Sequence, residues 1–247
     1  MANLRFYTNL PLIVGSNIQL SESAAVHATR ALRLNVGDSG IVFNGDGFDY
    51  NCTLTEIKKQ TVLAVVNSAK KITNESPLNI TLFQAISSGE RMDFTIQKAV
   101  ELGITSIQPF MSQRSVVKLS NERAEKRTEH WQNVAISACE QSGRAYVPTV
   151  SAPLSVSQLF AHLNKISEAN ACKITLVPNA TNCLKTMQKP SGNIYLLIGA
   201  EGGLSNDEIA LSVTHGFQAA QLGPRVLRTE TAALAAIAAM QTLWGDF

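Results

Sequence analysis

Strand-like and helix-like segments alternate along the sequence after Pro77, and this alternation limits the fold more than any other feature. The expected strands are short and rich in aliphatic residues, and they cover residues 80–85, 106–110, 174–177, 194–199 and 219–222. The expected helices are each followed by a glycine within two residues, and they cover residues 91–102, 122–141 and 206–215. Strands separated by helices tend to pair in parallel. The sequence therefore predicts an α/β domain with a mainly parallel sheet and helices on both faces.

The first 72 residues have a different pattern. Alternating apolar residues occur at 41–43, 50–57 and 61–66, and the turn sequence Asn-Gly-Asp-Gly occupies residues 44–47. Strands joined by tight turns indicate a small β-barrel. The polar segment that follows ends in proline, which disfavours both helix and strand. We therefore expect an N-terminal domain over residues 1–72, a linker over 73–77 and a C-terminal domain over 78–247.

Composition narrows the classes of function. Hydrophobic residues make up 45% of the chain, and no apolar run approaches the roughly 18 to 20 residues that cross a bilayer, so we expect a cytoplasmic, soluble protein without a membrane partner. The cysteines and histidines lack the spacings of zinc ligands, so no metal site is expected. A net charge of +2 is too small to indicate nucleic-acid binding by itself, although a local basic patch can provide it.

A glycine-rich segment, Gly-Ala-Glu-Gly-Gly at residues 199–203, joins an expected strand to an expected helix. Such a loop allows a ligand to approach the backbone closely. Its spacing does not fit the G-x-G-x-x-G pattern of dinucleotide sites, and Glu201 would repel a pyrophosphate. A cofactor with a positive charge, such as a sulfonium, suits Glu201 better. A tight turn without a ligand is the alternative.

Two further segments occupy comparable positions. Residues 177–179 follow one expected strand, and residues 222–231 follow another and lead into an alanine-rich helix over 232–243. In an open parallel sheet, ligands bind beyond the carboxyl ends of the strands, so these two segments and residues 199–203 are expected to form one pocket. Ser205 and Glu208 also predict a capping box at the start of the helix over 206–215.

Five separated motifs together carry a family resemblance. They are residues 97–104, 114–115, 140–144, 199–203 and 222–232. Arg5-Phe6-Tyr7 and the pattern His27-x-x-Arg30-x-x-Arg33 add to them. These motifs resemble those of the 16S ribosomal RNA uridine-N3 methyltransferase family (RsmE) of the SPOUT superfamily, and the resemblance covers nearly the whole chain. One departure is Ala200, where the family usually has proline.

The resemblance implies a PUA-like β-barrel at the N-terminus and a SPOUT α/β domain with a deep trefoil knot, against the general rule that chains do not thread loops. It also implies a homodimer that transfers a methyl group from S-adenosylmethionine (S-adenosyl-L-methionine) to N3 of a uridine in 16S rRNA of the small ribosomal subunit. The implied cofactor-binding residues are Leu176, Val177, Pro178, Ile198, Gly199, Ala200, Glu201, Gly202, Gly203, Leu222, Gly223, Val226, Leu227, Arg228 and Thr231.

Arg114, Glu201 and Glu230 are the candidates for catalytic roles. Arg114 follows an expected strand, and its fixed donors suit a phosphate or the carbonyl oxygens of uracil; a surface salt bridge is the alternative. The two carboxylates are the nearest to the expected pocket, but the sequence does not identify either as the general base, and water is a third candidate.

Five residues are expected to bind RNA: Arg5, His27, Arg30, Arg33 and Arg144. On a helix, His27, Arg30 and Arg33 would form one basic stripe able to hold phosphates. A solvated helix face is the alternative. For Arg144, an ion pair with Glu140 on the same helix is an equally good interpretation.

Two other classes of function remain open. One is a non-catalytic RNA-binding or ribosome-assembly protein with the same fold, which affinity for S-adenosylmethionine would distinguish. The other is a nucleotide-dependent oxidoreductase, which the missing dinucleotide pattern disfavours. The alanine-rich helix over 232–243 allows close approach of a second helix, so we expect it to contribute to a dimer interface, with core packing as the alternative.

Overall fold

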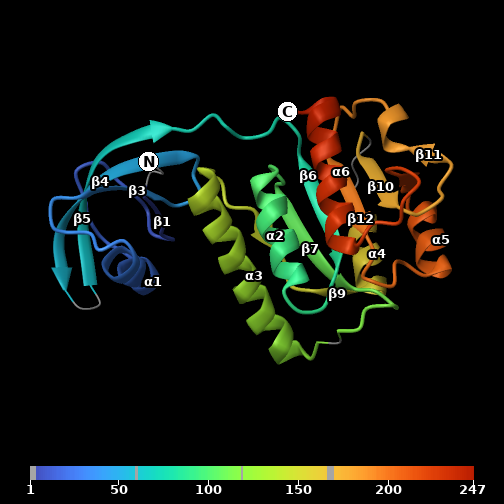
Figure 1. Cartoon of the computed structure of the whole chain (residues 1–247), viewed down its shortest axis with the longest axis horizontal. Helices are drawn as coiled ribbons and strands as arrows, with labels where there is room; N and C mark the ends of the chain where they lie inside the picture. Colours follow the sequence, from blue (N-terminus) through green and yellow to red (C-terminus); the bar gives the residue numbers. More distant parts are fainter. Residues whose placement is uncertain (1–3, 59–60, 118, 166–169) are drawn as a thin grey trace. The chain divides into compact units, whose positions relative to one another are not determined.

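The computed structural model describes residues 4–58, 61–117, 119–165 and 170–247. The chain divides into a small unit of residues 1–75 and 136–147 and a large unit of residues 76–135 and 148–247 (Figure 1). The expected division placed everything after residue 77 in one domain. Residues 136–147 belong instead to the small unit, because Glu140 accepts a hydrogen bond from the Tyr7 N–H and the Arg144 carbonyl accepts one from Arg5.

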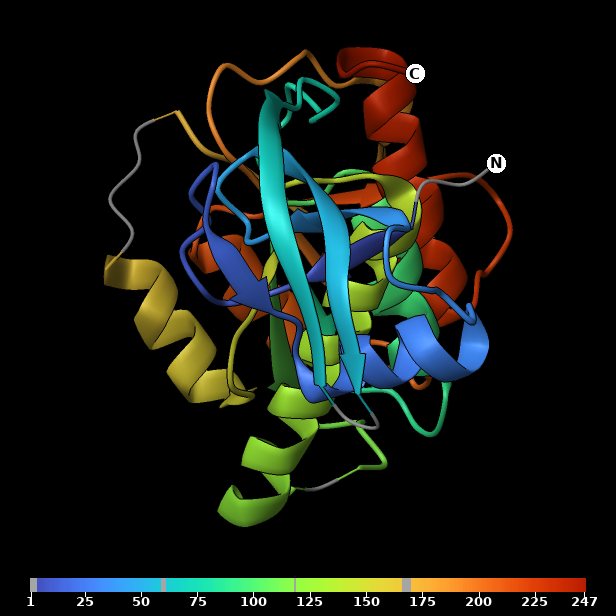
Figure 2. The same cartoon turned by 90° about the vertical axis from the view of Figure 1, so that its left-hand side faces the viewer.

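The small unit contains one sheet of mostly antiparallel strands. Its order is β1-β3-β4-β5-β2, from β1 (Arg5–Tyr7), β2 (Asn17–Gln19), β3 (Ser39–Phe43), β4 (Phe48–Lys58) and β5 (Thr61–Lys71). Neighbours pair antiparallel except β1 and β3, which are parallel. Figure 2 shows the long hairpin of β4 and β5. The predicted turn at residues 44–47 joins β3 to β4, and the apolar side chains of alternating strand residues, such as Val62, Ala64 and Val66, are buried.

The predicted α-helical stripe of basic residues is wrong in its geometry. Helix α1 (Glu22–Val26) continues as a π-helix, η1 (His27–Ala31), in which the Leu32 N–H donates to the His27 carbonyl. Arg33 lies beyond the π-helix with a φ of 53°, in the left-handed region. A π-helix has more residues per turn than an α-helix, and the chain changes direction at Arg33. His27, Arg30 and Arg33 therefore do not line up along one helix face. His27, Arg30 and Arg33 are nevertheless all exposed.

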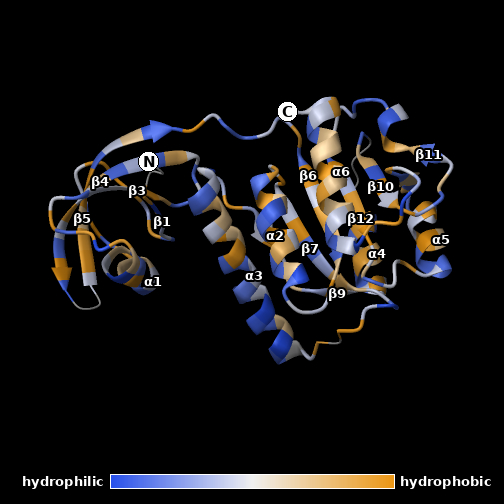
Figure 3. Ribbon diagram, viewed as in Figure 1, coloured by the Kyte–Doolittle hydropathy of each residue, from blue (hydrophilic) through white to orange (hydrophobic). Residues whose placement is uncertain are grey.

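The large unit confirms the predicted parallel sheet. Its order is β11-β13-β10-β12-β6-β7-β8, with β9 also on β7, from β6 (Ile80–Ala85), β7 (Ser106–Met111), β8 (Thr149–Val150), β9 (Leu154–Ser155), β10 (Cys172–Leu176), β11 (Asn182–Cys183), β12 (Ile194–Ile198) and β13 (Gln218–Gln221). All of these pairs are parallel. Every residue of β12 is buried, so helices cover both faces of the sheet there. The hydrophobic colouring of β6 and β12 in Figure 3 agrees with this.

The helices begin and end close to where the sequence predicts. The predicted ones are α2 (Arg91–Glu101), α3 (Asn121–Ser142), α5 (Asn206–Thr214) and α6 (Thr229–Trp244); α4 (Val156–Lys165) and the 3-10 helix η2 (Leu184–Thr186) were not predicted. Gly103, Gly143 and Gly216 follow α2, α3 and α5 with positive φ angles, as helix-ending glycines do. The predicted capping box of Ser205 and Glu208 is confirmed. No helix among the described residues is long and apolar enough to cross a membrane.

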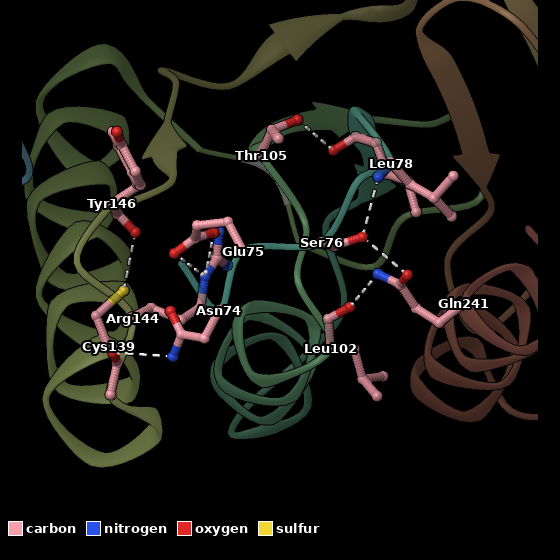
Figure 4. A network of polar contacts seen from close by, with 12 residues as sticks. Asn74, Glu75, Ser76, Leu78, Leu102, Thr105, Cys139, Arg144, Tyr146 and Gln241 are labelled. Atoms are coloured by element: carbon pink, nitrogen blue, oxygen red, sulfur yellow. Dashed lines mark hydrogen bonds and ion pairs between the residues drawn. The ribbon is translucent and has the colours of Figure 1, made fainter. Parts of the chain in front are cut away.

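The segment between β5 and β6 contains neither helix nor strand, and side chains fix each half within its own unit (Figure 4). In the small unit, Glu75 forms an ion pair with Arg144, with an N–O distance of 2.6 Å. In the large unit, the Ser76 hydroxyl donates to Gln241 Oε1 at 2.8 Å. Gln241 is fully buried and donates in turn to the Leu102 carbonyl at 2.7 Å. Glu75 and Ser76, both in the expected linker, are thus each held by side-chain contacts within their own unit.

Candidate active site

The carboxyl ends of β10, β12 and β13, which are neighbours in the sheet, meet at a cavity of about 310 Å³. The lining includes the last residue of β10 and the two after it (176–178), the last residue of β12 and the loop after it (198–204), and residues between 220 and 227 at the end of β13 and beyond it. Arg114, from the loop after β7, completes one wall, and α6 contributes Thr229 and Ala232. The predicted convergence of the three loops on one pocket is confirmed.

Most of the residues predicted to bind a cofactor line this cavity: Leu176, Val177, Pro178, Ile198, Gly199, Ala200, Glu201, Gly202, Gly203, Leu222, Gly223, Val226 and Leu227. Arg228 and Thr231 are exposed and are not among the described residues that line it. Sequence reasoning missed part of the lining: Leu204, Ile209, Ala220, Gln221, Arg225, Thr229 and Ala232. Several of these residues are next to predicted ones in the sequence. Ala220 and Gln221 end β13 directly before the predicted Leu222, so the position of that strand was a sufficient signal for them.

Two glycines of the β12 loop, Gly199 and Gly203, are required by the turn itself. The Gly203 N–H donates to the Ala200 carbonyl at 2.9 Å, which closes a tight turn, and Gly203 has a φ of 69°. A Cβ atom on Gly199 would lie 2.7 Å from the carbonyl carbon of Gly203. A tight turn is therefore present, and the same segment lines a cavity.

Side chains from neighbouring segments hold this turn by its carbonyl groups. Arg114 Nη1 donates to the Gly202 carbonyl at 3.0 Å. Thr229, at the start of α6, donates its hydroxyl to the Gly199 carbonyl at 2.6 Å and accepts a hydrogen bond from Gln84 at 3.0 Å. Gln84 and Thr229 are buried. The turn is therefore fixed by polar groups of the protein, as preorganised binding loops are.

The Glu201 side chain is held by Ser88, in the loop after β6, and by Arg91, at the start of α2. Its Oε1 accepts hydrogen bonds from the Ser88 N–H at 2.8 Å, the Ser88 hydroxyl at 2.7 Å and Arg91 Nη1 at 3.0 Å. Partial burial alone would raise the pKa of Glu201, but the hydrogen bonds from Ser88, from its own backbone and from Arg91 lower that pKa to about 2. Such a carboxylate is a poor proton acceptor near neutral pH.

Glu230 lies in the first turn of α6, outside the described lining of the cavity. Its Oε1 is 4.0 Å from Arg91 Nε. Its Oε2 is buried and has no hydrogen-bond partner within the described part of the chain. Glu230 thus has a buried oxygen without a hydrogen-bond partner among the described residues, whereas the three donors to Glu201 all converge on its Oε1. No group of three or more His, Cys, Asp and Glu side chains in the described ranges is arranged to hold a metal ion.

The residues predicted to bind RNA fall into two groups within the small unit. Arg5 is buried, forms an ion pair with Asp49, donates to the Arg144 carbonyl at 2.9 Å and lies 4.6 Å from the centre of the Phe43 ring. Arg144 is also buried, with Glu75 as an ion-pair partner. These two guanidinium groups are used inside the unit, so their placement gives no support to direct RNA contact.

His27, Arg30 and Arg33 form the exposed group.

The alternative ion pair between Arg144 and Glu140 is not the contact that is seen. Arg144 pairs with Glu75, and Glu140 accepts a hydrogen bond from the Tyr7 N–H at 3.0 Å. Burial of the Glu140 carboxyl raises its pKa, and that hydrogen bond and the nearby positive charges only partly counter the effect.

Comparison with known proteins finds matches to RNA methyltransferase families in both units. A family model described as an RNA methyltransferase domain matches residues 74–241, and one described as an RNA methyltransferase PUA domain matches residues 20–67. The ribosomal RNA small subunit methyltransferase E of Buchnera aphidicola subsp. Acyrthosiphon pisum is 34% identical over 245 residues, which are 98% of this chain and 94% of that protein.

Two solved structures resemble the whole chain. The ribosomal RNA small subunit methyltransferase E of Neisseria gonorrhoeae, crystallised with S-adenosylmethionine, is 44% identical, with a TM-score of 0.91 and 99% of each chain covered. A methyltransferase of Legionella pneumophila, in complex with the same cofactor, is 36% identical, with a TM-score of 0.94 and 100% of each chain covered. The small unit is therefore related to PUA domains, and the chain has a mixed α/β fold.

Proposed function

The chain belongs to the RNA methyltransferase family, and from this premise we propose that it transfers a methyl group from S-adenosylmethionine to N3 of a uridine in 16S rRNA of the small ribosomal subunit. The observation that carries the proposal is the cavity at the carboxyl ends of β10, β12 and β13. It lies where the sequence motifs predict a cofactor. A relative that is 44% identical was crystallised with S-adenosylmethionine.

The residues around the cavity fit this cofactor. A volume of about 310 Å³ is at the lower end of the range for small-molecule sites, which is roughly 300–1,000 Å³. Leu176, Ile198 and Leu227 offer apolar surface for an adenine ring, and the peptide groups of the turn at residues 199–203 offer hydrogen bonds to polar groups. When bound, S-adenosylmethionine supplies an electrophilic methyl group on a sulfonium.

The chain's own residues would prepare the uridine. N3 of uridine must lose its imino proton, and donors to the uracil carbonyl oxygens stabilise the resulting anion. Arg114 lies at the cavity wall and has further N–H donors besides the one that binds Gly202, so we assign this role to Arg114. Glu201 is unsuited to the role of general base because of its low pKa. Glu230 remains a candidate, and water is the alternative.

RNA binding is assigned to three exposed basic residues of the small unit. His27, Arg30 and Arg33 are available to hold phosphates, which position an RNA without specifying its sequence. Arg5 and Arg144 would support the fold of that unit. We propose RNA-holding and catalytic roles for residues 1–72 and 78–247, connected by 73–77, except that residues 136–147 belong with the RNA-holding unit.

We also propose the finer features that the family resemblance implies: closure of the small sheet into a PUA-like barrel, and a deep trefoil knot in the large unit. Two observations favour the knot. β12 lies between β10 and β6 although it follows both in the chain, and α6 packs against β12, α2 and η2. We further propose a cytoplasmic homodimer with α6 at its interface, because several alanines of α6 are incompletely buried and Leu243 is 45% exposed.

Calorimetric titration with S-adenosylmethionine tests the proposed function. We expect saturable binding of one cofactor per chain, with no heat from a nicotinamide dinucleotide used as the control ligand. Binding would separate the enzyme from a non-catalytic RNA-binding or ribosome-assembly protein of the same fold. Absence of binding in a folded preparation would favour the non-catalytic protein, and binding of the nicotinamide compound alone would favour an oxidoreductase.

A further inference from the structure

We propose that Arg91 is a positioning residue for the cofactor-binding turn and that it acts through Glu201. Arg91 is the first residue of α2 and is not among the described residues that line the cavity, whereas Glu201 is. The Nη1 of Arg91 donates to Glu201 Oε1 at 3.0 Å. This inference rests on the proposed function, because it concerns how the site holds S-adenosylmethionine.

The turn is held at both of its central residues. Glu201 and Gly202 lie between Ala200 and Gly203, whose backbone groups close the turn. Arg114, from the loop after β7, binds the Gly202 carbonyl, while Arg91 and Ser88 bind the Glu201 carboxylate. Because glycine-rich backbone is intrinsically free to move, the hydrogen bonds to Glu201 select one conformation of the turn before a ligand arrives.

The charge of Glu201 is already matched by the protein. Three donors converge on Oε1, and one of them is a guanidinium. The side chain of Glu201 is only 25% exposed. An ion pair of this kind leaves little net charge to attract a cationic cofactor. Glu201 would therefore serve the shape of the turn, whereas the sequence alone favoured direct attraction between Glu201 and a sulfonium.

Two ligands of nearly the same shape separate these roles. S-adenosylmethionine has a positively charged sulfonium, and S-adenosylhomocysteine has a neutral thioether. If Glu201 attracts the charge, Glu201→Gln should weaken the first ligand more than the second. If Arg91 and Glu201 position the turn, Arg91→Met and Glu201→Gln should each weaken both ligands by the same factor.

The experiment is a double-mutant cycle by calorimetry with both ligands and with thermal unfolding as the check on folding. For Arg91→Met we expect affinity for both ligands to fall roughly three- to tenfold, the scale of one partly exposed charge-assisted hydrogen bond. The double variant should bind no more weakly than the weaker single variant, because both changes break the Arg91–Glu201 hydrogen bond and the 4.0 Å contact of Arg91 with Glu230 lies outside the turn. Arg91→Lys, which keeps a cationic donor group, should recover part of the loss.

Lys98→Met is the matched control. Lys98 lies on the same helix and pairs with Glu101, so its loss removes an ion pair of α2 without touching the turn. We expect its ligand affinities to equal those of the unaltered protein. Unchanged affinities in Arg91→Met, additive effects in the double variant, or a selective loss of S-adenosylmethionine binding in Glu201→Gln would each refute the positioning role. Failure of the unaltered protein to bind either ligand would refute the proposed function instead.

Discussion

Gly202 is the residue at which the turn, Arg114 and the cavity meet. A Cβ atom at this position would lie 3.1 Å from the Cβ of Arg114 and 3.6 Å from its carbonyl oxygen. The first distance is tighter than ordinary packing, so Arg114 would have to move. Since Arg114 also binds the Gly202 carbonyl, a side chain at residue 202 would disturb the hydrogen bond that fixes this side of the turn.

Gly202→Val should therefore lower cofactor affinity at least tenfold, and Gly202→Ala should have a smaller effect in the same direction. We expect either variant to lose about 1–3 kcal/mol of folding free energy at most, the usual cost of overpacking. Calorimetry with S-adenosylmethionine measures the affinity, and denaturant unfolding measures the stability. Full affinity in a folded Gly202→Val variant would place the cofactor elsewhere.

Glu201 gives a prediction about pH. Its pKa in the folded protein is about 2, against an ordinary value of 4.5. Because the folded-state pKa is the lower one, the ionised carboxylate stabilises the fold fully above the unfolded-state pKa, and that contribution is lost as pH falls through the folded-state pKa.

The difference in melting temperature between the unaltered protein and Glu201→Gln should therefore be constant above about pH 5 and should shrink as the pH falls towards 2. Thermal unfolding of both proteins over a pH series measures it. A difference that stays constant down to pH 3, or grows there, would contradict the hydrogen bonds assigned to Glu201.

At the scale of elements, the short π-helix η1 and the residues after it present three exposed basic groups of the small unit, His27, Arg30 and Arg33. Arg30→Gln with Arg33→Gln should weaken RNA binding and lower the magnitude of its salt slope by roughly 0.7 to 0.9 for each phosphate that is no longer bound. Glutamine keeps a long polar side chain, and Arg33 with its φ of 53° is not exchanged for a much smaller residue. RNA affinity at several salt concentrations is the measurement.

Cofactor titration of the same double variant is the control, because both residues lie in the small unit and the cavity lies in the large unit. We expect cofactor affinity to be unchanged. An unaltered RNA affinity and salt slope would show that these arginines are solvated surface residues that do not bind RNA. A collapse of cofactor binding would show that the substitutions had damaged the fold.

Elements with a strong periodic pattern were predictable from the sequence. The strands β6 and β12 are short aliphatic runs that the parallel sheet buries, and Gly103 and Gly216 end helices because glycine adopts positive φ readily. Helix α4 was missed although its buried Leu159, Phe160 and Leu163 follow helical spacing. The π-helix η1 was not predictable, because its residues carry no local signal that distinguishes it from an α-helix.

The candidate site was predictable only in part for a related reason. Loops at the carboxyl ends of parallel strands are found from strand positions alone, so the cavity lining followed from the pattern. The ion pairs of Glu201 with Arg91 and of Arg5 with Asp49 join residues far apart in the sequence. Which charged partner a side chain selects depends on tertiary packing. The contacts that fix the turn at Glu201 and the burial of Arg5 could therefore be found only from the structure.

At the scale of the whole molecule, family membership, the cavity and the two units lead to one central claim, which is methyl transfer to N3 of a uridine in small-subunit rRNA. The two family models, described as an RNA methyltransferase domain and an RNA methyltransferase PUA domain, together match residues in both units. The claim specifies the atom that is methylated and therefore one chemical product, N3-methyluridine. It can be tested by identifying that product.

The most direct measurement is mass spectrometry of 16S rRNA nucleosides after undermethylated small ribosomal subunits are incubated with the protein and S-adenosylmethionine carrying an isotopically labelled methyl group. We predict N3-methyluridine that carries the label, absent when the protein is omitted. Absence of labelled N3-methyluridine under conditions where a related methyltransferase produces it, or label on a different atom of the RNA, would contradict the account.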